Sequence, residues 1–359
     1  MARWRRITGA AGLAAGAAAA GAGAVLAAER ATIGRMRVKP DPAAAEPFGQ
    51  LRGRSVTVLA DDGVGLHTEI NGPDDSPVTI VFCHGYTLNQ DTWHYQRKYL
   101  AAVSRLVFWD QRGHGRSGSS SPEHVTIDQL GADLYAVLMA TVPGDSPVVL
   151  VGHSMGGMTI MALADQHPEL FGTKVIGAAL ISTAVSEIDP TVWLPGPLRS
   201  VARYAAPTVL RGAASGRGAP LIERSRHAAS QIAFLSTRLI AFGDPAISPT
   251  VVDFLERIIR MTPIEVVTDF FHALLKHDKL TALRVLGQVP VVVVTGEKDR
   301  VVPLRQSEIL AAEIPDAELL TVPGAGHVII LECPDLINEV IIDLVTRATE
   351  GRTRRDQSA

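Results

Sequence analysis

Residues 147–157 read PVVLVGHSMGG, a pattern typical of a strand that turns sharply into a helix. A run of apolar, mostly β-branched residues ends at Val151, and a helical pattern begins after the glycines. Ser154 lies between them in a G-x-S-x-G motif, a tight turn that presents a serine hydroxyl at a sheet edge and at a helix N-terminus. Ser154 is therefore the candidate nucleophile.

Strand and helix patterns alternate on both sides of this stretch. Strand patterns occur at 55–59, 66–70, 78–83, 105–109, 147–151, 175–181, 289–295 and 317–322. Helical patterns occur at 91–101, 126–140, 155–166, 303–313 and 335–348. Fully apolar strands such as 291–294 are typical of a parallel sheet with helices on both faces. The sequence predicts an α/β fold with a doubly wound, mostly parallel sheet, formed by residues 55–183 and 288–349.

Residues 184–287 interrupt the alternation, with helical patterns at 222–242, 250–261 and 264–276 and no convincing strand. We expect a helical cap over the carboxyl edge of the sheet, where ligands bind in such folds. The cap is rich in large apolar residues. We expect most of them to pack on the sheet and some to line an apolar pocket: Trp193, Leu194, Leu198, Leu210, Phe234, Leu235, Phe242, Phe254, Phe270 and Phe271.

Two residues at the ends of later strands are candidates to activate Ser154. A serine hydroxyl needs a base to take its proton, and the base needs an orienting carboxylate. Asp299 follows the strand pattern at 289–295, and His327 follows the one at 317–322. We expect both at the same sheet edge as Ser154. Other carboxylates stay open as alternatives to Asp299: Glu297, Glu187 and Asp189.

Acyl transfer also needs two hydrogen-bond donors for the developing oxyanion. The amide of Met155, directly after the nucleophile, is the first candidate. The second is the amide of Tyr86, in the loop CHGYT that follows the strand pattern at 78–83. We expect His84 in this loop to be structural.

Five motifs occur in an order that resembles the α/β-hydrolase superfamily over about residues 55–348: HG at 84–85, DQRGHGRSG at 110–118, GHSMGG at 152–157, GEKDRVVP at 296–303 and GAGHVIILECP at 324–334. The resemblance implies Ser154 as nucleophile, Asp299 as acid, His327 as base, and Tyr86 and Met155 as oxyanion donors. It also implies a structural role for the 110–118 motif, with Asp110 and Arg112.

The resemblance implies a serine hydrolase that cleaves small-molecule or lipid esters without a cofactor or a metal ion. The aspartate nucleophile of related epoxide hydrolases and dehalogenases is excluded by Ser154. Other chemistry with the same triad stays open: thioester, carbon–carbon or peptide cleavage, and haloperoxidase-like activity. A non-catalytic binding protein with this fold is the alternative from another class. The sequence does not determine the oligomeric state.

Composition bounds the class of protein. The 359 residues are 47% hydrophobic and carry 34 basic and 37 acidic side chains, for a net charge of −3. This balance argues against disorder and against nucleic-acid binding. Two cysteines, Cys83 and Cys333, exclude a disulfide framework and a cysteine-based zinc site.

Residues 1–38 are expected to be a signal or anchor segment. Residues 7–28 carry no charge and are long enough, as a helix, to cross a bilayer. We expect membrane association through 7–28 or export, with a cytoplasmic location as the alternative. A proline-containing linker is expected at 39–54 and a polar tail at 350–359. A chain that begins near residue 45 is expected to be soluble and active.

Overall fold

An eight-stranded sheet forms the centre of the part of the chain that the computed structural model describes, residues 41–187 and 237–358. Its strands are β1 (Arg54–Leu59), β2 (Gly65–Asn71), β3 (Thr79–Cys83), β4 (Arg105–Trp109), β5 (Val148–His153), β6 (Val175–Ile181), β7 (Val291–Gly296) and β8 (Glu318–Val322). The order across the sheet is β1-β2-β4-β3-β5-β6-β7-β8. β2 pairs antiparallel with β1 and β4, and the other pairs are parallel.

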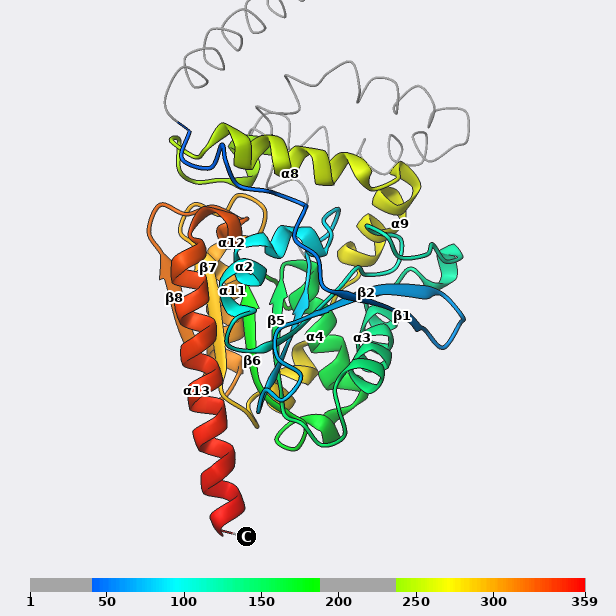
Figure 1. Ribbon diagram of the computed structural model, residues 1–359, viewed down its shortest axis with the longest axis vertical. Coiled ribbons are helices and arrows are strands. Elements are labelled where there is room, and N and C mark those ends of the chain that lie inside the picture. Colours follow the sequence, from blue (N-terminus) through cyan, green and yellow to red (C-terminus); the bar gives the residue numbers. More distant parts are fainter. Residues whose placement is uncertain (1–40, 188–236, 359) are drawn as a thin grey trace, which may run out of the picture.

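Helices cover both faces of the sheet (Figure 1). One face is covered by α2 (His94–Leu100) and α13 (Pro334–Ser358), and the other by α3 (Ile127–Thr141), α4 (Met155–Gln166), α10 (Leu283–Leu286) and α11 (Leu304–Glu313). The remaining helices are α8 (Pro249–Met261), α9 (Ile264–Leu275), α12 (Ile329–Glu332), and the single turns η1 (Gln90–Trp93), η2 (Pro122–His124), η3 (Pro168–Leu170) and η5 (Leu280–Ala282).

The apolar pattern of each element explains these layers. Along β3, Ile80 and Phe82 belong to the core under α13, whereas Val81 and Cys83 belong to the core under α3 and α4. Successive strand residues point to opposite faces, so a strand buried on both faces must be apolar throughout. α13 contributes residues three or four positions apart, a spacing that places them on one helix face: Ile337, Ile341, Leu344 and Ala348. The predicted fold class is therefore confirmed.

The described part of the predicted cap is helical. α8 and α9 correspond to the patterns at 250–261 and 264–276, and both lie beyond the carboxyl edge of the sheet (Figure 1). The Ser248 hydroxyl accepts a hydrogen bond from the Val251 amide, and Pro249 occupies the first turn, a typical helix start. Residues 188–236, which include the rest of the predicted cap, lie outside the described residues.

The segment expected to be a linker is partly packed on α8. The Asp41 carboxylate accepts hydrogen bonds from the Thr250 amide at 3.1 Å and the Thr250 hydroxyl at 2.7 Å. Phe48 is buried, and its ring stacks on Phe254 with the centroids 4.6 Å apart. Residues 41–48 therefore help to hold the start of α8, which the prolines and small residues of 39–54 do not reveal.

The N-terminal segment and the C-terminal tail were expected to be an anchor and a polar tail. Residues 1–38, with the predicted anchor at 7–28, lie outside the described residues. Across 41–187 and 237–358, no helix combines the length and apolar character needed to cross a membrane. At the other end, the expected tail continues α13 as far as Ser358, with Arg354 and Glu350 one helical turn apart and 3.7 Å from each other. Such pairs stabilise a helix that projects into solvent.

Candidate active site

Ser154 occupies a strained turn between β5 and α4. Its backbone angles are φ 52° and ψ −118°, a region that side chains other than glycine rarely adopt. The turn is held on both sides: the Ser154 amide donates to the Ile181 carbonyl at 2.9 Å, and the Ser154 carbonyl accepts from the Thr183 hydroxyl at 2.7 Å. Strain of this kind persists where surrounding contacts fix it, typically at functional sites.

Gly156 permits the close packing that this turn requires. A Cβ atom on Gly156 would lie 2.0 Å from the carbonyl oxygen of Cys83, the last residue of β3. Only glycine therefore lets the first turn of α4 pack against the neighbouring strand. This contact brings the α4 N-terminus and the loop after β3 to the same place at the sheet edge.

Asp299 and His327 are joined by a hydrogen bond between the loops after β7 and β8. The Nδ1 atom of His327 lies 2.9 Å from the Asp299 Oδ2 atom. The other carboxylate oxygen of Asp299 accepts from the amides of Val301 and Val302, each at 2.8 Å, and the side chain is fully buried. A carboxylate held in this way fixes the Nδ1–H tautomer of His327 and leaves Nε2 as the basic nitrogen.

The alternative carboxylates lie elsewhere. Glu297 accepts a hydrogen bond from the Gly324 amide at 2.9 Å on an exposed surface. Glu187 is exposed at the end of a described segment, and Asp189 lies outside the described residues. Of the described candidates, Asp299 is the one that contacts His327.

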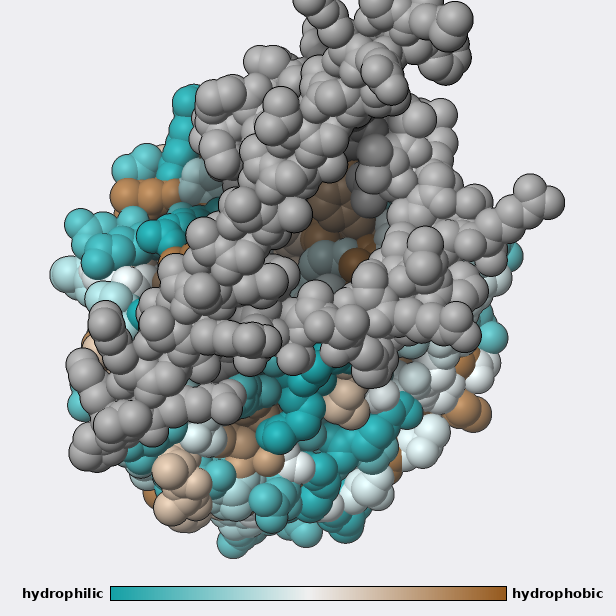
Figure 2. All heavy atoms as spheres, turned by 90° about the horizontal axis from the view of Figure 1, so that it is seen from above, coloured by the Kyte–Doolittle hydropathy of each residue, from teal (hydrophilic) through white to brown (hydrophobic). Residues whose placement is uncertain are grey.

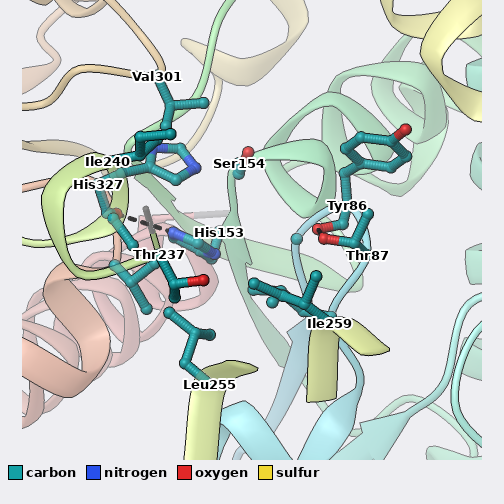
Figure 3. A pocket seen from close by; sticks show the side chains of 14 residues that line it. Tyr86, Thr87, His153, Ser154, Thr237, Ile240, Leu255, Ile259, Val301 and His327 are labelled. Atoms are coloured by element: carbon teal, nitrogen blue, oxygen red, sulfur yellow. Dashed lines mark hydrogen bonds between the residues drawn. The ribbon is translucent and has the colours of Figure 1, made fainter. Parts of the chain in front are cut away.

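Ser154 and His327 line one pocket, in which their side chains face each other (Figure 3). In the described part of the chain, no direct hydrogen bond joins the Ser154 hydroxyl to the imidazole. Catalytic contacts of this kind often tighten only when a substrate is bound. Met155 begins α4, where backbone N–H groups have no partner within the helix. Tyr86 lies on the wall of the same pocket, in the loop after β3.

The pocket has a volume of about 250 Å³, and its walls are mostly apolar. The apolar side chains come from the β3 loop, α8, the segment before α8 and the loops after β7 and β8: Leu88, Leu255, Ile259, Ile240, Ala241, Val301 and Val328. None of its described lining residues is Asp, Glu, Lys or Arg. The view onto this end of the molecule shows apolar surface deep in its centre (Figure 2).

Of the large cap residues named from the sequence, those that the structure describes pack as expected or are half-buried, like Phe271, but none lines the pocket as some were expected to do. Phe242, Phe254 and Phe270 are buried in the core clusters and do not line the pocket. The described cap residues that reach the pocket are smaller side chains on α8 and on residues 237–241. Trp193, Leu194, Leu198, Leu210, Phe234 and Leu235 lie outside the described residues.

Comparison with known proteins decides the family. The family model described as "alpha/beta hydrolase fold" matches residues 78–334, which is most of the chain. The chain belongs to this family.

Individual relatives are distant. The chain is 25% identical over 285 residues to the dihydrolipoyllysine-residue acetyltransferase component of an acetoin cleaving system from Pseudomonas putida, covering 76% of this chain and 64% of the relative. It is 24% identical over 302 residues to a monoacylglycerol lipase from Mycolicibacterium smegmatis, covering 79% and 92%. Three of the curated relatives are matched over only 64%, 26% and 44% of their own length.

A solved structure agrees with the fold. The enol-lactonase from Burkholderia xenovorans LB400 superposes with a TM-score of 0.64 at 23% identity, over 81% of this chain and 100% of that one. At this identity the likeness shows the fold alone. The chain is thus a member of the α/β-hydrolase family, and its relatives include a monoacylglycerol lipase.

The family motif at 110–118 is structural here, as the resemblance implied. Asp110 accepts hydrogen bonds from the Gln90 amide at 2.8 Å and the Arg116 amide at 3.0 Å. The buried guanidinium of Arg112 makes two hydrogen bonds of 2.6 Å to the Asp133 carboxylate on α3. Asp110 and Arg112 therefore hold loops together, and neither residue lines the pocket.

Two buried histidines, His84 and His153, support the site, and His153 also lines the pocket. His84 Nε2 accepts from the Gln111 amide at 2.9 Å, so its Nδ1 donates to the Gly85 carbonyl at 2.8 Å. His153 Nε2 donates to the His327 carbonyl at 3.0 Å. Burial lowers the pKa of His84 to about 4 and that of His153 to about 3. Both rings are therefore neutral at physiological pH. The sequence predicted a structural His84, whereas the contact of His153 was missed because it lies in a variable position of the motif.

A metal centre has no candidate in the described ranges, where no three His, Cys, Asp or Glu side chains come close enough to bind an ion.

Proposed function

We propose that this protein is a serine hydrolase that cleaves neutral carboxylic or lipid esters through an acyl-enzyme on Ser154. The observation that carries the proposal is the 2.9 Å hydrogen bond between Asp299 and His327, with His327 and Ser154 lining one apolar pocket. A serine, a histidine with a fixed tautomer and a buried carboxylate are the groups that acyl transfer requires.

In the first half of the reaction, the Ser154 hydroxyl oxygen attacks the ester carbonyl carbon while His327 Nε2 takes the hydroxyl proton. The Asp299 carboxylate stabilises the imidazolium that forms and keeps its orientation. The amides of Met155 and Tyr86 donate to the oxyanion of the tetrahedral intermediate. The bond to the leaving oxygen then breaks, and His327 passes its proton to the departing alcohol.

In the second half, a water molecule takes the place of the alcohol. His327 removes a proton from this water as it attacks the acyl carbon, and the second tetrahedral intermediate collapses to the carboxylic acid and free Ser154. The proton balance closes because His327 returns its proton to the Ser154 oxygen.

The pocket supports an apolar acyl group as the preferred substrate part. Its described walls are mostly apolar, and they offer no Asp, Glu, Lys or Arg side chain to a carboxylate or an amine on the substrate. Burial of each additional methylene is worth about 0.8 kcal/mol, so medium-chain esters gain binding over acetate.

A phosphonate probe tests the nucleophile. A fluorophosphonate should add one phosphonyl group to the wild-type protein, as seen by intact-mass spectrometry, and none to Ser154→Ala. Ser76, on the turn before β3 at the opposite edge of the sheet, supplies the control, because Ser76→Ala should still be labelled. A folded wild-type protein that is not labelled would rule out the serine hydrolase.

The substrate class is tested with p-nitrophenyl esters from acetate to laurate. We expect kcat/KM to rise from acetate toward medium chains. Hydrolysis of acetate alone would contradict an apolar acyl pocket. Matched thioesters and peptides, measured in parallel, separate ester cleavage from the other reactions that use the same triad.

A further inference from the structure

Glu332, at the end of α12, binds two segments of the chain that are far apart in sequence. Its carboxylate accepts a hydrogen bond from the Gly326 amide at 2.7 Å, directly before His327. It also accepts from the amides of Gly243 at 3.0 Å and Asp244 at 2.5 Å, in the segment that leads into α8. Hydrogen bonds to an ionised acceptor are stronger than those between neutral groups. One half-buried carboxylate therefore fixes three backbone donors.

The segment bound by Glu332 on the cap side forms a wall of the pocket. Thr237, Ile240 and Ala241 line the pocket, and the Gly243 amide follows two residues later. On the other side, the His327 loop carries the catalytic base of the proposed function. Glu332 is thus in contact with both the pocket wall and the base, although its side chain does not line the pocket.

Close packing between the two segments makes their relative position specific. The Ala241 carbonyl accepts a hydrogen bond from the Val328 amide at 2.9 Å. A Cβ atom on Gly243 would lie 2.2 Å from the Gly324 carbonyl oxygen. The backbones are therefore in direct contact, and a displacement of one segment must move the other.

We propose that Glu332 is a positioning residue that couples the acyl-pocket wall to His327, an inference that rests on the proposed function. Without the carboxylate, the Gly326 amide on one side and the Gly243 and Asp244 amides on the other lose their acceptor. The His327 loop and the 237–244 segment can then shift together. Displacement of a catalytic group by about 1 Å costs on the order of 100-fold in rate.

The other contact on the same loop gives a matched comparison. Glu297 also accepts a hydrogen bond from a backbone amide of this loop, that of Gly324 at 2.9 Å. Unlike Glu332, Glu297 is exposed, and among the described residues it makes no hydrogen bond to the cap-side segment. Glu297→Gln thus removes the same type of charge and bond from the same loop without touching the coupling.

The test measures kcat and KM of the full chain for p-nitrophenyl esters of increasing length. Glu332→Gln keeps the size of the side chain but replaces one acceptor oxygen with an NH2 group, which can only donate. We expect kcat to fall by about 10- to 100-fold for every ester, because the base is displaced, and KM to rise most for the longest acyl groups. Glu297→Gln should change both constants by less than about twofold.

Phosphonate titration of active sites separates positioning from simple loss of fold. If Glu332→Gln has fewer phosphonate-reactive sites per protein but an unchanged kcat per reactive site, Glu332 only supports the fold. That result would overturn the inference. Constants equal to those of Glu297→Gln would overturn it as well. Absence of labelling in the wild-type protein is a different result, because it refutes the proposed function itself. Glu332→Ala should show the same split between kcat and KM with a larger loss.

Discussion

Replacement of Ser154 by glycine should stabilise the protein while it abolishes turnover. Ser154 is held at φ 52° and ψ −118°, and strained backbone of this kind costs about 1–3 kcal/mol for a residue with a Cβ atom. Glycine removes that cost but adds about 0.5–1 kcal/mol of chain entropy to the unfolded state. Ser154→Ala keeps the Cβ atom and hence the strain. We therefore expect Ser154→Gly to exceed Ser154→Ala in free energy of unfolding by about 1 kcal/mol.

The assay is urea unfolding followed by tryptophan fluorescence, since Trp93 and Trp109 are fully buried and report the core. Ser307 provides the control, because it is a buried serine inside α11 with ordinary helical surroundings. There the order should reverse: Ser307→Gly should be less stable than Ser307→Ala by about 1 kcal/mol, the usual helix preference. Ester hydrolysis is measured on all four variants.

Two results would contradict this prediction. Equal or lower stability of Ser154→Gly relative to Ser154→Ala would mean that the turn stores no strain at this residue. Retained turnover in Ser154→Ala would mean that the strained serine is not the nucleophile.

Three further predictions concern the acid, the pH dependence of stability and the N-terminal segment. Asp299→Asn should lower kcat by about 10³- to 10⁴-fold in ester hydrolysis, because the amide no longer fixes the Nδ1–H tautomer of His327. If Asp299→Asn stays active while Glu187→Gln or Asp189→Asn loses activity, the orienting carboxylate is Glu187 or Asp189 instead. Burial lowers the pKa of His84 and His277 to about 4 and that of His114 and His153 to about 3. In the unfolded chain these histidines have pKa values near 6.5, so the unfolded chain binds more protons than the folded one between about pH 6.5 and pH 4. Each of them should therefore lower the free energy of unfolding by about 1.4 kcal/mol for each pH unit below about 6.5. Urea midpoints at pH 8, 7, 6 and 5 measure this dependence, and His277→Gln should make it less steep. A chain that begins at residue 41 should stay in the supernatant of a membrane pelleting assay, whereas the full-length chain should sediment. A chain that begins at residue 45 should have a free energy of unfolding about 0.5–2 kcal/mol lower than one that begins at residue 41. The reason is that it lacks the hydrogen bonds of Asp41 to Ser248 and Thr250 at the start of α8.

Local patterns were sufficient to predict the strands and the residues at their ends. The run Val291–Val294 lies inside β7 because a strand covered on both faces must be apolar throughout. Ser154, Asp299 and His327 were predicted together because the carboxyl ends of parallel strands meet at one sheet edge. The structure brings Asp299 and His327 into contact and places Ser154 in the same pocket.

Contacts between distant segments could not be read from the sequence. The segment at 39–54 has the composition of a linker, yet the Asp41 carboxylate accepts a hydrogen bond from the Thr250 amide on α8, more than two hundred residues away. Glu332 likewise bonds to the Gly243 amide, and a backbone donor leaves no mark in the sequence. The polar residues after 349 fit either a frayed end or an exposed helix, since i,i+4 pairs such as Glu350 and Arg354 are compatible with both.

His153 and Glu332 both support the His327 loop, the first with a neutral ring and the second with a carboxylate. His153 donates to the His327 carbonyl, and the two ring centroids are 4.9 Å apart. In the proposed mechanism His327 becomes positively charged in each half-reaction, so a second cation at that distance would oppose proton transfer. Burial, followed by the charge of His327, lowers the pKa of His153 to about 3, and the ring stays neutral. The negative carboxylate of Glu332 acts instead through the backbone amide of Gly326. A neutral donor at the ring and a charged acceptor on the backbone thus hold the base without opposing its protonation.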